Sequence, residues 1–380
     1  MTREQTRQAQ SLARGAAGVA LLHIERAHAG LATWSAAHTW VQAATRSEIS
    51  AADQAGLFAG APAIAFILHA AGSRYDRYLS GIDATVASLA HRRVDAALAR
   101  IRRRELTAFA EYDLLFGLTG IGQLLLRHDP GSDALGRILT YLVRLTEPIP
   151  VDGTTLPGWW TVHDPDPLLP TPGGHANIGL AHGITGPLAL LSSAYRAGVT
   201  VDGHIDAIQT ICQHLDTWRQ DSESGPWWPQ WITRDDLRTG RPSHPRPPRP
   251  SWCYGTPGIA RALQLAAIAV HDTACQSAAE DALARCLADP TQLALISDPG
   301  LCHGWAGLYQ TAWRAAAEAL TPAIGQHLAH VAELLLQRAQ ATTDLPDGLL
   351  DGTAGLALAL HTARHNTPPI SGWDACLLIT

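Results

Sequence analysis

The sequence predicts an all-α protein in which seven inner and seven outer helices alternate to form a closed ring of helical hairpins. A Gly-x-x-Gly element recurs along the chain at intervals of 45 to 72 residues, which is roughly the length of two helices and two loops. An apolar run of helical composition follows each element, and amphipathic segments lie between these runs. Outside loops the chain lacks the sustained alternation of β-branched residues that strands show.

The glycine elements mark the expected start of each inner helix. Glycine permits a tight turn there and lets a neighbouring backbone approach closely. Seven copies, each followed by an apolar run of helical composition, are difficult to explain by chance. They are Gly15/Gly18, Gly60/Ala63, Gly117/Gly120, Gly183/Gly186, Gly255/Gly258, Gly304/Gly307 and Gly352/Gly355, with alanine replacing the second glycine in the second copy.

The segments between the glycines separate into two kinds. The runs after the glycines are apolar nearly all round, as expected of helices buried on both sides; they are 19–24, 121–126, 188–191, 259–268, 308–317 and 356–360. Amphipathic segments typical of outer helices are 82–103, 134–145, 205–218 and 324–339. Two long irregular stretches, 148–177 and 221–250, lead into the fourth and fifth elements, and loops of this length are usually functional or mobile.

Composition excludes several classes of protein. The chain has 380 residues, of which 46% are apolar and 16% charged, and its formal charge of -6 gives no nucleic-acid footprint. No uncharged apolar stretch reaches the roughly eighteen residues of a membrane span, and residues 1–5 lack the apolar run of a signal peptide. We therefore expect one domain over residues 1–380 in a cytoplasmic protein, without a transmembrane segment.

Six cysteines are too few for a disulfide scaffold, and a reducing compartment favours metal binding or catalysis for any special ones. Four of them lie among apolar or helical residues, and we expect these to be buried free thiols. They are Cys212, Cys275, Cys286 and Cys376.

The other two cysteines directly precede glycine elements. Cys253 lies two residues before Gly255, and Cys302 and His303 come immediately before Gly304. In a closed ring the loops before the inner helices all lie at one end, so these side chains are expected to converge. Two thiolates and an imidazole suit Zn²⁺ with one exchangeable position, and adjacent ligands differ from zinc-finger spacing. We predict one zinc ion per chain, bound by Cys253, Cys302 and His303.

A zinc site with two thiolates favours thiol chemistry over hydrolysis. The thiolates neutralise most of the metal charge, so bound water is less acidified than at a three-histidine site. A substrate thiol in the fourth position would be deprotonated and remain able to attack. Addition of a thiolate to an activated alkene gives an enolate, which needs charge stabilisation and then a proton.

Polar residues before other inner helices could meet these needs. His182 is predicted to donate the proton because imidazole titrates near neutral pH, and Asp113 to orient the ring or keep it protonated. Tyr254 and Arg249 are predicted to stabilise negative oxygen. Simpler interpretations exist for each: a core histidine, a packing tyrosine and a solvated arginine. Further polar candidates are His175, Asn177 and Asp351, the last with a helix cap as its simpler role.

Four segments resemble those of the lanthionine synthetase C family, the lanthipeptide cyclases. They are Asp113-Leu-Leu-Phe-Gly117-Leu-Thr-Gly120, Gly179-Leu-Ala-His182-Gly183, Trp252-Cys253-Tyr254-Gly255 and Cys302-His303-Gly304. The resemblance covers nearly the whole chain and implies an α/α toroid of seven inner and seven outer helices. It also implies zinc on Cys253, Cys302 and His303, with acid–base and enolate-stabilising roles for Asp113, His182, Arg249 and Tyr254.

Members of this family join cysteine thiols of a ribosomally made precursor peptide to dehydroalanine or dehydrobutyrine, which forms lanthionine and methyllanthionine rings. The resemblance implies a dehydrated precursor with leader and core as the substrate, a dehydratase and an exporter as partners, and peripheral attachment to the membrane in such a complex. A length of 380 residues suits a stand-alone cyclase. In place of the β-rich insertion of some cyclases, the interval between the second and third elements is helical and rich in arginine.

Three alternatives stay open at the level of sequence. One keeps the zinc chemistry but adds glutathione to dehydrated proteins. Another is a non-catalytic peptide-binding scaffold with a structural zinc, which predicts a fourth protein ligand. A third is a glycoside hydrolase on a similar ring, which needs two opposed carboxylates; Asp113 and Asp351 are available for these.

Overall fold

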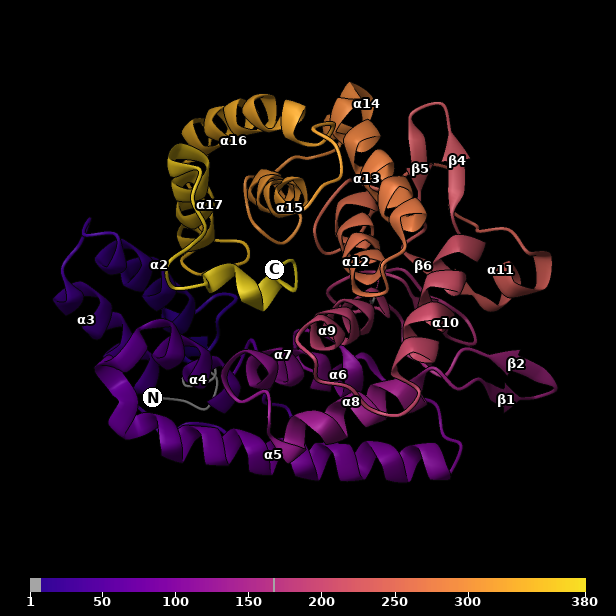
Figure 1. Ribbon diagram of the computed structural model, residues 1–380, viewed down its shortest axis with the longest axis horizontal. Helices are drawn as coiled ribbons and strands as arrows, with labels where there is room; N and C mark the ends of the chain where they lie inside the picture. Colours follow the sequence, from indigo (N-terminus) through magenta and orange to yellow (C-terminus); the bar gives the residue numbers. More distant parts are fainter. Residues whose placement is uncertain (1–7, 167) are drawn as a thin grey trace.

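The computed structural model describes residues 8–166 and 168–380. Seven inner helices form a closed ring, in which each helix contacts the next and the last contacts the first (Figure 1). Every predicted apolar run lies in one of them, and most of their residues are buried on all sides. They are α2 (Ala16–His28), α4 (Ala61–Ala70), α7 (Leu118–His128), α9 (Thr185–Arg196), α12 (Thr256–Ala269), α15 (Trp305–Ala317) and α17 (Thr353–His365).

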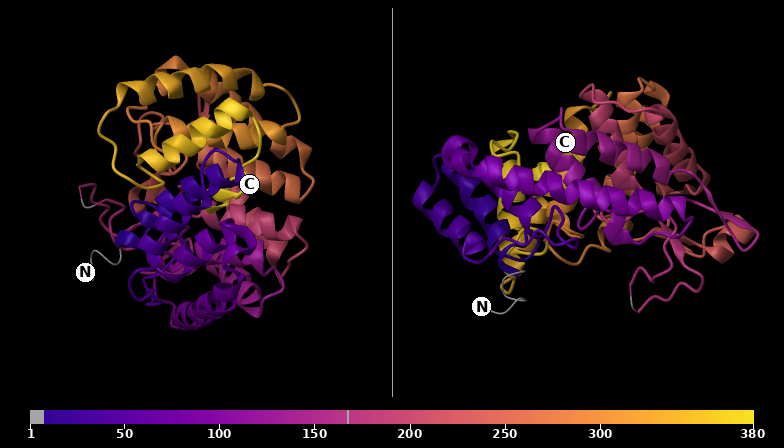
Figure 2. Two further views of the ribbon diagram at one scale, coloured as in Figure 1. Left: turned by 90° about the vertical axis from the view of Figure 1, so that its left-hand side faces the viewer. Right: turned by 90° about the horizontal axis from the view of Figure 1, so that it is seen from below.

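Six long helices in the described residues form an outer layer, and each packs on the inner helix that precedes it. They are α3 (Trp34–Thr45), α5 (Asp76–Arg102), α8 (Asp133–Leu145), α10 (His204–Thr217), α13 (Thr273–Ala288) and α16 (Leu328–Ala341). All four predicted amphipathic segments coincide with members of this layer, and Figure 2 shows the longest, α5, running along the outside of the ring. A seventh outer helix stays a prediction.

Short elements lie in the loops. Three antiparallel pairs of short strands are β1 (Ile149–Val151) with β2 (Thr154–Leu156), β3 (His175–Asn177) with β6 (Trp231–Thr233), and β4 (Gln220–Ser222) with β5 (Gly225–Trp227). The short helices are η1 (Gly72–Tyr75), α6 (Phe109–Tyr112), α11 (Arg234–Thr239), α14 (Pro290–Leu293), η2 (Gly325–His327) and η3 (Trp373–Leu377). The pair β3–β6 joins the two long stretches that lack a periodic pattern in the sequence.

Backbone hydrogen bonds connect the seven loops that precede the inner helices into a continuous circuit. Each loop donates to or accepts from the next loop around the ring, and the seventh closes on the first. The bonds run from Leu12 N to Phe58 O (3.0 Å), Phe58 N to Leu115 O (3.3 Å), Leu114 N to Ala181 O (3.1 Å), Leu180 N to Cys253 O (3.0 Å), Cys253 N to Cys302 O (3.2 Å), Cys302 N to Leu350 O (3.0 Å) and Leu350 N to Ala13 O (3.1 Å). All seven loops therefore lie at one end of the ring.

The second glycine of each element explains how the loop packs so closely on its own helix. In all six complete elements, a Cβ at this glycine would lie less than 3.0 Å from the carbonyl oxygen of the residue six positions earlier. For Gly355 that residue is Leu349, and for Gly258 it is Trp252. The glycines thus leave room for the backbone of the pre-helical loop, which confirms the close approach predicted from sequence.

Replacement of Gly355 by alanine is expected to lower the free energy of unfolding by about 3 kcal/mol, the upper end of the usual range, because the new methyl group overlaps a backbone carbonyl. The matched control is Gly136→Ala in α8, where a Cβ meets no atom within 4 Å. That substitution is expected to stabilise the chain by about 0.5–1 kcal/mol. Urea unfolding followed by circular dichroism measures both, and equal effects of the two changes would contradict the close-approach explanation.

The segment around η3 fills the middle of the ring, where the carboxyl end of the described chain lies in Figure 1. Residues 373–379 are at most 2% exposed. Inner helices and the Trp252 loop hold this segment: the indole Nε1 of Trp252 donates to Leu377 O (2.8 Å), and Arg314 makes two hydrogen bonds to Asp374. None of the described helices has the length and apolarity needed to cross a bilayer.

Candidate metal centre and catalytic site

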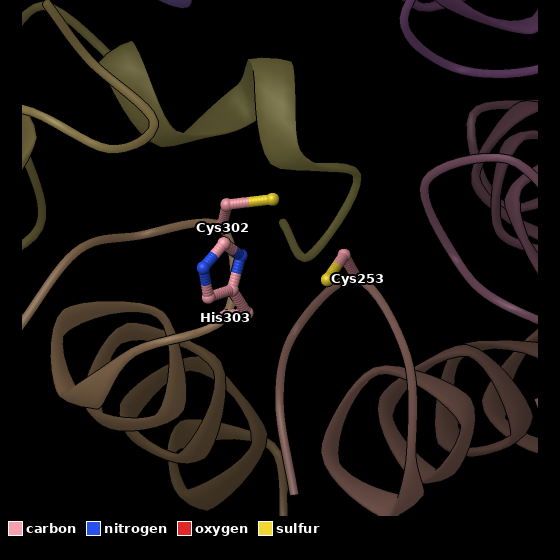
Figure 3. Close-up of side chains that lie close together, drawn as sticks. All are labelled: Cys253, Cys302 and His303. Atoms are coloured by element: carbon pink, nitrogen blue, oxygen red, sulfur yellow. The ribbon is translucent and has the colours of Figure 1, made fainter. Parts of the chain in front are cut away.

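Two neighbouring loops of the circuit bring the three predicted metal ligands together. Cys253 precedes α12, and Cys302 and His303 precede α15. One donor atom from each side chain lies within 4.8 Å of the other two (Figure 3). The Cys253 side chain is buried, whereas Cys302 and His303 are half-buried. In the described part of the chain, this is the one cluster of three or more metal-binding side chains, and it has three donors.

The donor set fits zinc. Tetrahedral coordination with Zn–S bonds of about 2.3 Å places two sulfur atoms about 3.8 Å apart, which small side-chain movements reach from the present spacing. Of the two thiols, Cys253 is the one favoured in its deprotonated form. Hydrogen bonds from Cys302 and His303 outweigh burial and hold the pKa of Cys253 well below its ordinary value, while the neighbouring Cys253 raises the pKa of Cys302.

A carboxylate beside His303 escaped the sequence analysis. Asp298 Oδ2 lies 3.4 Å from His303 Nε2, and its other oxygen accepts a hydrogen bond from Gly300 N (2.9 Å). Metal-binding histidines typically have such a partner on the ring nitrogen that does not bind the metal, because it fixes the ring and the tautomer. In the sequence Asp298 looks like an ordinary turn residue before Pro299, so no signal identified it.

The half-buried His182 and the buried Asp113 form a hydrogen-bonded pair. Asp113 is fully buried; its Oδ1 accepts hydrogen bonds from the N–H groups of Phe116 and Gly117 (2.7 Å each), and its Oδ2 lies 2.7 Å from His182 Nδ1. The His182 side chain keeps 26% of its surface exposed. This arrangement assigns Nδ1 to Asp113 and leaves Nε2 available for proton transfer.

Burial disfavours the charged imidazolium, but the hydrogen bond and charge of Asp113 outweigh it and raise the pKa of His182. Asp113→Asn is therefore expected to lower this pKa, so that less of the imidazole is protonated at pH 7. Titration of the His182 ring by NMR measures the change. The control is Glu105→Gln, which removes the carboxylate of the exposed Arg103–Glu105 ion pair and is expected to leave the pKa of His182 unchanged. An unshifted pKa would contradict the assigned role of Asp113.

Tyr254 lies beside the three predicted metal ligands because it follows Cys253 directly. Its hydroxyl oxygen accepts a hydrogen bond from Asn177 Nδ2 (2.8 Å), and its ring packs against Gly179, where a Cβ would come within 2.6 Å of two ring carbons. Burial raises the pKa of the phenol well above its ordinary value. The hydroxyl is therefore neutral at pH 7 and can donate a hydrogen bond.

Arg249 carries a buried Nε atom that has no hydrogen-bond partner among the described residues. A hydrogen bond with Cys253 raises the pKa of His303, while the positive charge of Arg249 opposes this rise, so the guanidinium lies close enough to His303 to affect its pKa. An N–H donor that is buried and unpaired in this way is available to an oxygen of a bound molecule.

The fold and site geometry can now be compared with known proteins. Residues 7–378 match the family described as lanthionine synthetase C-like protein. The chain belongs to this family. That membership confirms the resemblance identified from the four sequence segments. It covers nearly the whole chain, so both long loops and all seven glycine elements fall within the matched region.

Two relatives illustrate the similarity. Nisin biosynthesis protein NisC from Lactococcus lactis subsp. lactis is 26% identical over 208 residues, which cover 53% of this chain and 48% of that protein. The match thus spans about half the length of this curated relative. A solved structure of nisin cyclase superposes with a TM-score of 0.85 at 20% identity, and the match covers 99% of this chain and 94% of that one. This likeness shows the fold: an α/α toroid.

The remaining polar candidates in this family member lie outside the cluster. Asp351 accepts hydrogen bonds from Nε (3.3 Å) and Nη2 (3.1 Å) of Arg14 in the adjoining loop of the ring. His175 is fully buried, its Nδ1 lies 3.4 Å from two threonine hydroxyls, and burial lowers its pKa to about 4. Asp113 is hydrogen-bonded to His182 and Asp351 to Arg14, so neither is a free carboxylate, which disfavours glycoside hydrolysis by this pair.

The other cysteines only partly follow the prediction of buried thiols. Cys286 and Cys376 are buried, but Cys275 is exposed and Cys212 is half-buried. Cys275 lies in the first turn of the outer helix α13, and an outer helix presents part of every turn to solvent. Residue composition around it could not reveal which face of the helix it occupies.

Proposed function

We propose that this chain is a zinc-dependent lanthipeptide cyclase. It would add cysteine thiols of a ribosomally made precursor peptide to dehydroalanine or dehydrobutyrine and so form lanthionine and methyllanthionine rings. One observation carries the proposal: the toroid gathers Cys253, Cys302 and His303 beside a loop that presents Tyr254, with an aspartate-held histidine on the adjoining loop. Membership of the lanthionine synthetase C-like family supports it.

Zinc bound by the three side chains would supply Lewis-acid chemistry, lowering the pKa of a peptide thiol that enters the fourth position. The three-donor cluster supports an exchangeable position, which a structural zinc in a peptide-binding scaffold would not have. Asp298 would orient His303 for metal binding.

The chain's own residues would manage the charge and the proton. As the sulfur–Cβ bond forms, the π electrons of the alkene move towards the neighbouring carbonyl and give an enolate. Tyr254 O–H and the unpaired N–H of Arg249 would stabilise its oxygen. His182 would then donate the proton on Nε2 to Cα. The thiol proton leaves to solvent, and the imidazole regains a proton from solvent. Asp113 favours the protonated imidazole and so keeps this acid available near neutral pH.

The addition consumes an alkene, so a dehydration of serine or threonine must precede it and supply the substrate. We accordingly propose a dehydrated peptide with leader and core as the partner. The single domain over residues 1–380 and the roles of the site residues belong to the same proposal.

A thiol-blocking experiment tests the function. The zinc-loaded protein is incubated with a dehydrated precursor peptide, and remaining free thiols are alkylated and counted by mass spectrometry, since cyclisation itself leaves the mass unchanged. We expect alkylation to fall with time, and to stay undiminished with protein treated with a chelator. Undiminished alkylation with the zinc-loaded protein would refute the proposal. A gain of the mass of glutathione when glutathione is supplied, with the peptide thiols still alkylated, would favour intermolecular addition.

A further inference from the structure

The geometry points to Asn177 as a positioning residue that turns the hydroxyl hydrogen of Tyr254 towards the reacting carbonyl. The inference rests on the proposed function, in which Tyr254 stabilises the enolate oxygen. It concerns a residue that touches neither the metal-ligand side chains nor, in this proposal, the peptide. Three contacts of the Asn177 segment carry it.

The first contact fixes the orientation of the Asn177 amide. The side chain is fully buried at the end of β3, and its Oδ1 accepts a hydrogen bond from Gly179 N at 3.0 Å. A backbone N–H can be met only by an acceptor, so the amide oxygen must face Gly179. The NH₂ group is therefore turned the other way, to Tyr254.

The second contact fixes the hydrogen of the phenol. Asn177 Nδ2 lies 2.8 Å from the Tyr254 oxygen and, as a donor only, it occupies an acceptor position of that oxygen. The single O–H of Tyr254 must then point elsewhere. In the described chain no other partner for this hydroxyl is present, so its hydrogen is free for an oxygen that enters the site.

The third contact fixes the position of the phenol. The Tyr254 ring lies on the backbone of Gly179, which leaves no room for a Cβ there. The N–H of Leu180, the next residue, donates to Cys253 O (3.0 Å). The short segment 177–180 thus holds the tyrosine ring, its hydroxyl and the backbone of a metal ligand together.

These contacts define what Asn177 does for the reaction. A donor that is already aimed at the place where negative charge develops needs no reorganisation in the transition state, and such preorganised donors are worth about 10²–10³-fold in rate. Without the amide, the phenol could rotate and present a lone pair to the enolate. Asn177 therefore acts on kcat through Tyr254 and has little effect on peptide binding.

Asn177→Asp is a near-isosteric test. The new carboxylate still accepts from Gly179 N but can only accept from Tyr254, so the hydroxyl hydrogen turns away from the substrate. We expect kcat for cyclisation to fall about 100-fold, as for loss of one oxyanion donor, with KM within about threefold. In a Tyr254→Phe background the same change is expected to cost less than about threefold, because the hydroxyl that it redirects is gone.

Controls separate this role from damage to the fold. Asn366→Asp changes the other asparagine of the chain, whose Oδ1 accepts from Trp313 Nε1 (2.8 Å), and it is expected to leave kcat unchanged. Zinc content and thermal unfolding are measured for every variant. If Asn177→Asp does not fold, Asn177→Ser replaces it in the double-mutant cycle with Tyr254→Phe. We expect Asn177→Ser to lower kcat about tenfold in the wild-type background and to have no effect in the Tyr254→Phe background. Losses that multiply in the double variant would overturn the inference.

A spectroscopic measurement makes the inference independent of activity. Protein labelled with ¹³C at the Cζ atoms of its seven tyrosines gives one resonance for Tyr254, which Tyr254→Phe identifies. Asn177→Asp is expected to move this resonance downfield, because the phenol becomes a donor to a carboxylate. An unmoved resonance would overturn the inference even in an active cyclase. An inactive wild-type protein with the expected shift would instead overturn the proposed function and leave the orienting contact established.

Discussion

Replacing Cys253 by alanine is expected to reduce zinc content from one ion per chain to less than about a tenth of that, and to lower the cyclisation rate about 1,000-fold. Two effects add. Loss of the metal returns the substrate thiol to a pKa near 8.5, so that only about 3% is thiolate at pH 7, which alone costs roughly 30-fold. Loss of the fixed position of the sulfur accounts for the remainder.

Zinc is measured by atomic absorption on purified protein, and cyclisation by the thiol-blocking assay. The matched control is Cys286→Ala, since Cys286 is an equally buried thiol on the outer helix α13 with Gln292 as its partner. This variant is expected to keep its zinc and its activity. Retention of a full zinc ion by Cys253→Ala, or an undiminished rate without it, would remove the metal ligand role on which the mechanism depends.

Replacing His182 by asparagine is expected to lower kcat about 1,000-fold while zinc content and KM stay within about twofold. The substitution removes the proton donor to the enolate, and general acids of this kind contribute about 10²–10⁴-fold. His182 is not in the metal-ligand cluster, and its Nδ1 is occupied by Asp113, so the change acts on the proton step alone.

Incorporation of deuterium at Cα provides the direct measurement for this step. In the wild-type protein, cyclisation in D₂O labels each new ring at Cα, and in His182→Asn the thiol adduct is expected to form and revert without net product. His204→Gln is the control, because His204 is a buried histidine on α10 that bonds the Leu191 carbonyl. If His182→Asn retained the full rate of cyclisation, another group would have to be the proton donor.

The sequence and the structure contributed different parts of this description. The glycine elements predicted the ring because the second glycine of each complete element has a local steric cause. A Cβ at this position would overlap the carbonyl oxygen six residues earlier in the same loop. The convergence of Cys253, Cys302 and His303 was also predictable from sequence, since each directly precedes an inner helix and all such loops meet at one end of the ring. In both cases the structural feature that explains the sequence pattern lies only a few positions away along the chain.

Contacts between side chains from different repeats were decided only by the tertiary structure. Asn177 reaches Tyr254 across 77 positions and Arg14 reaches Asp351 across 337, through loops with no periodicity to fix which way a side chain points. The segment 175–177 has no periodic pattern in the sequence, but in the structure it pairs with 231–233 as a short antiparallel strand. The sequence determined which chemical groups stand at the ends of the inner helices. Their partners depend on the closure of the ring, because a hydrogen bond requires an alignment of atoms to within tenths of an ångström that residue type alone does not specify.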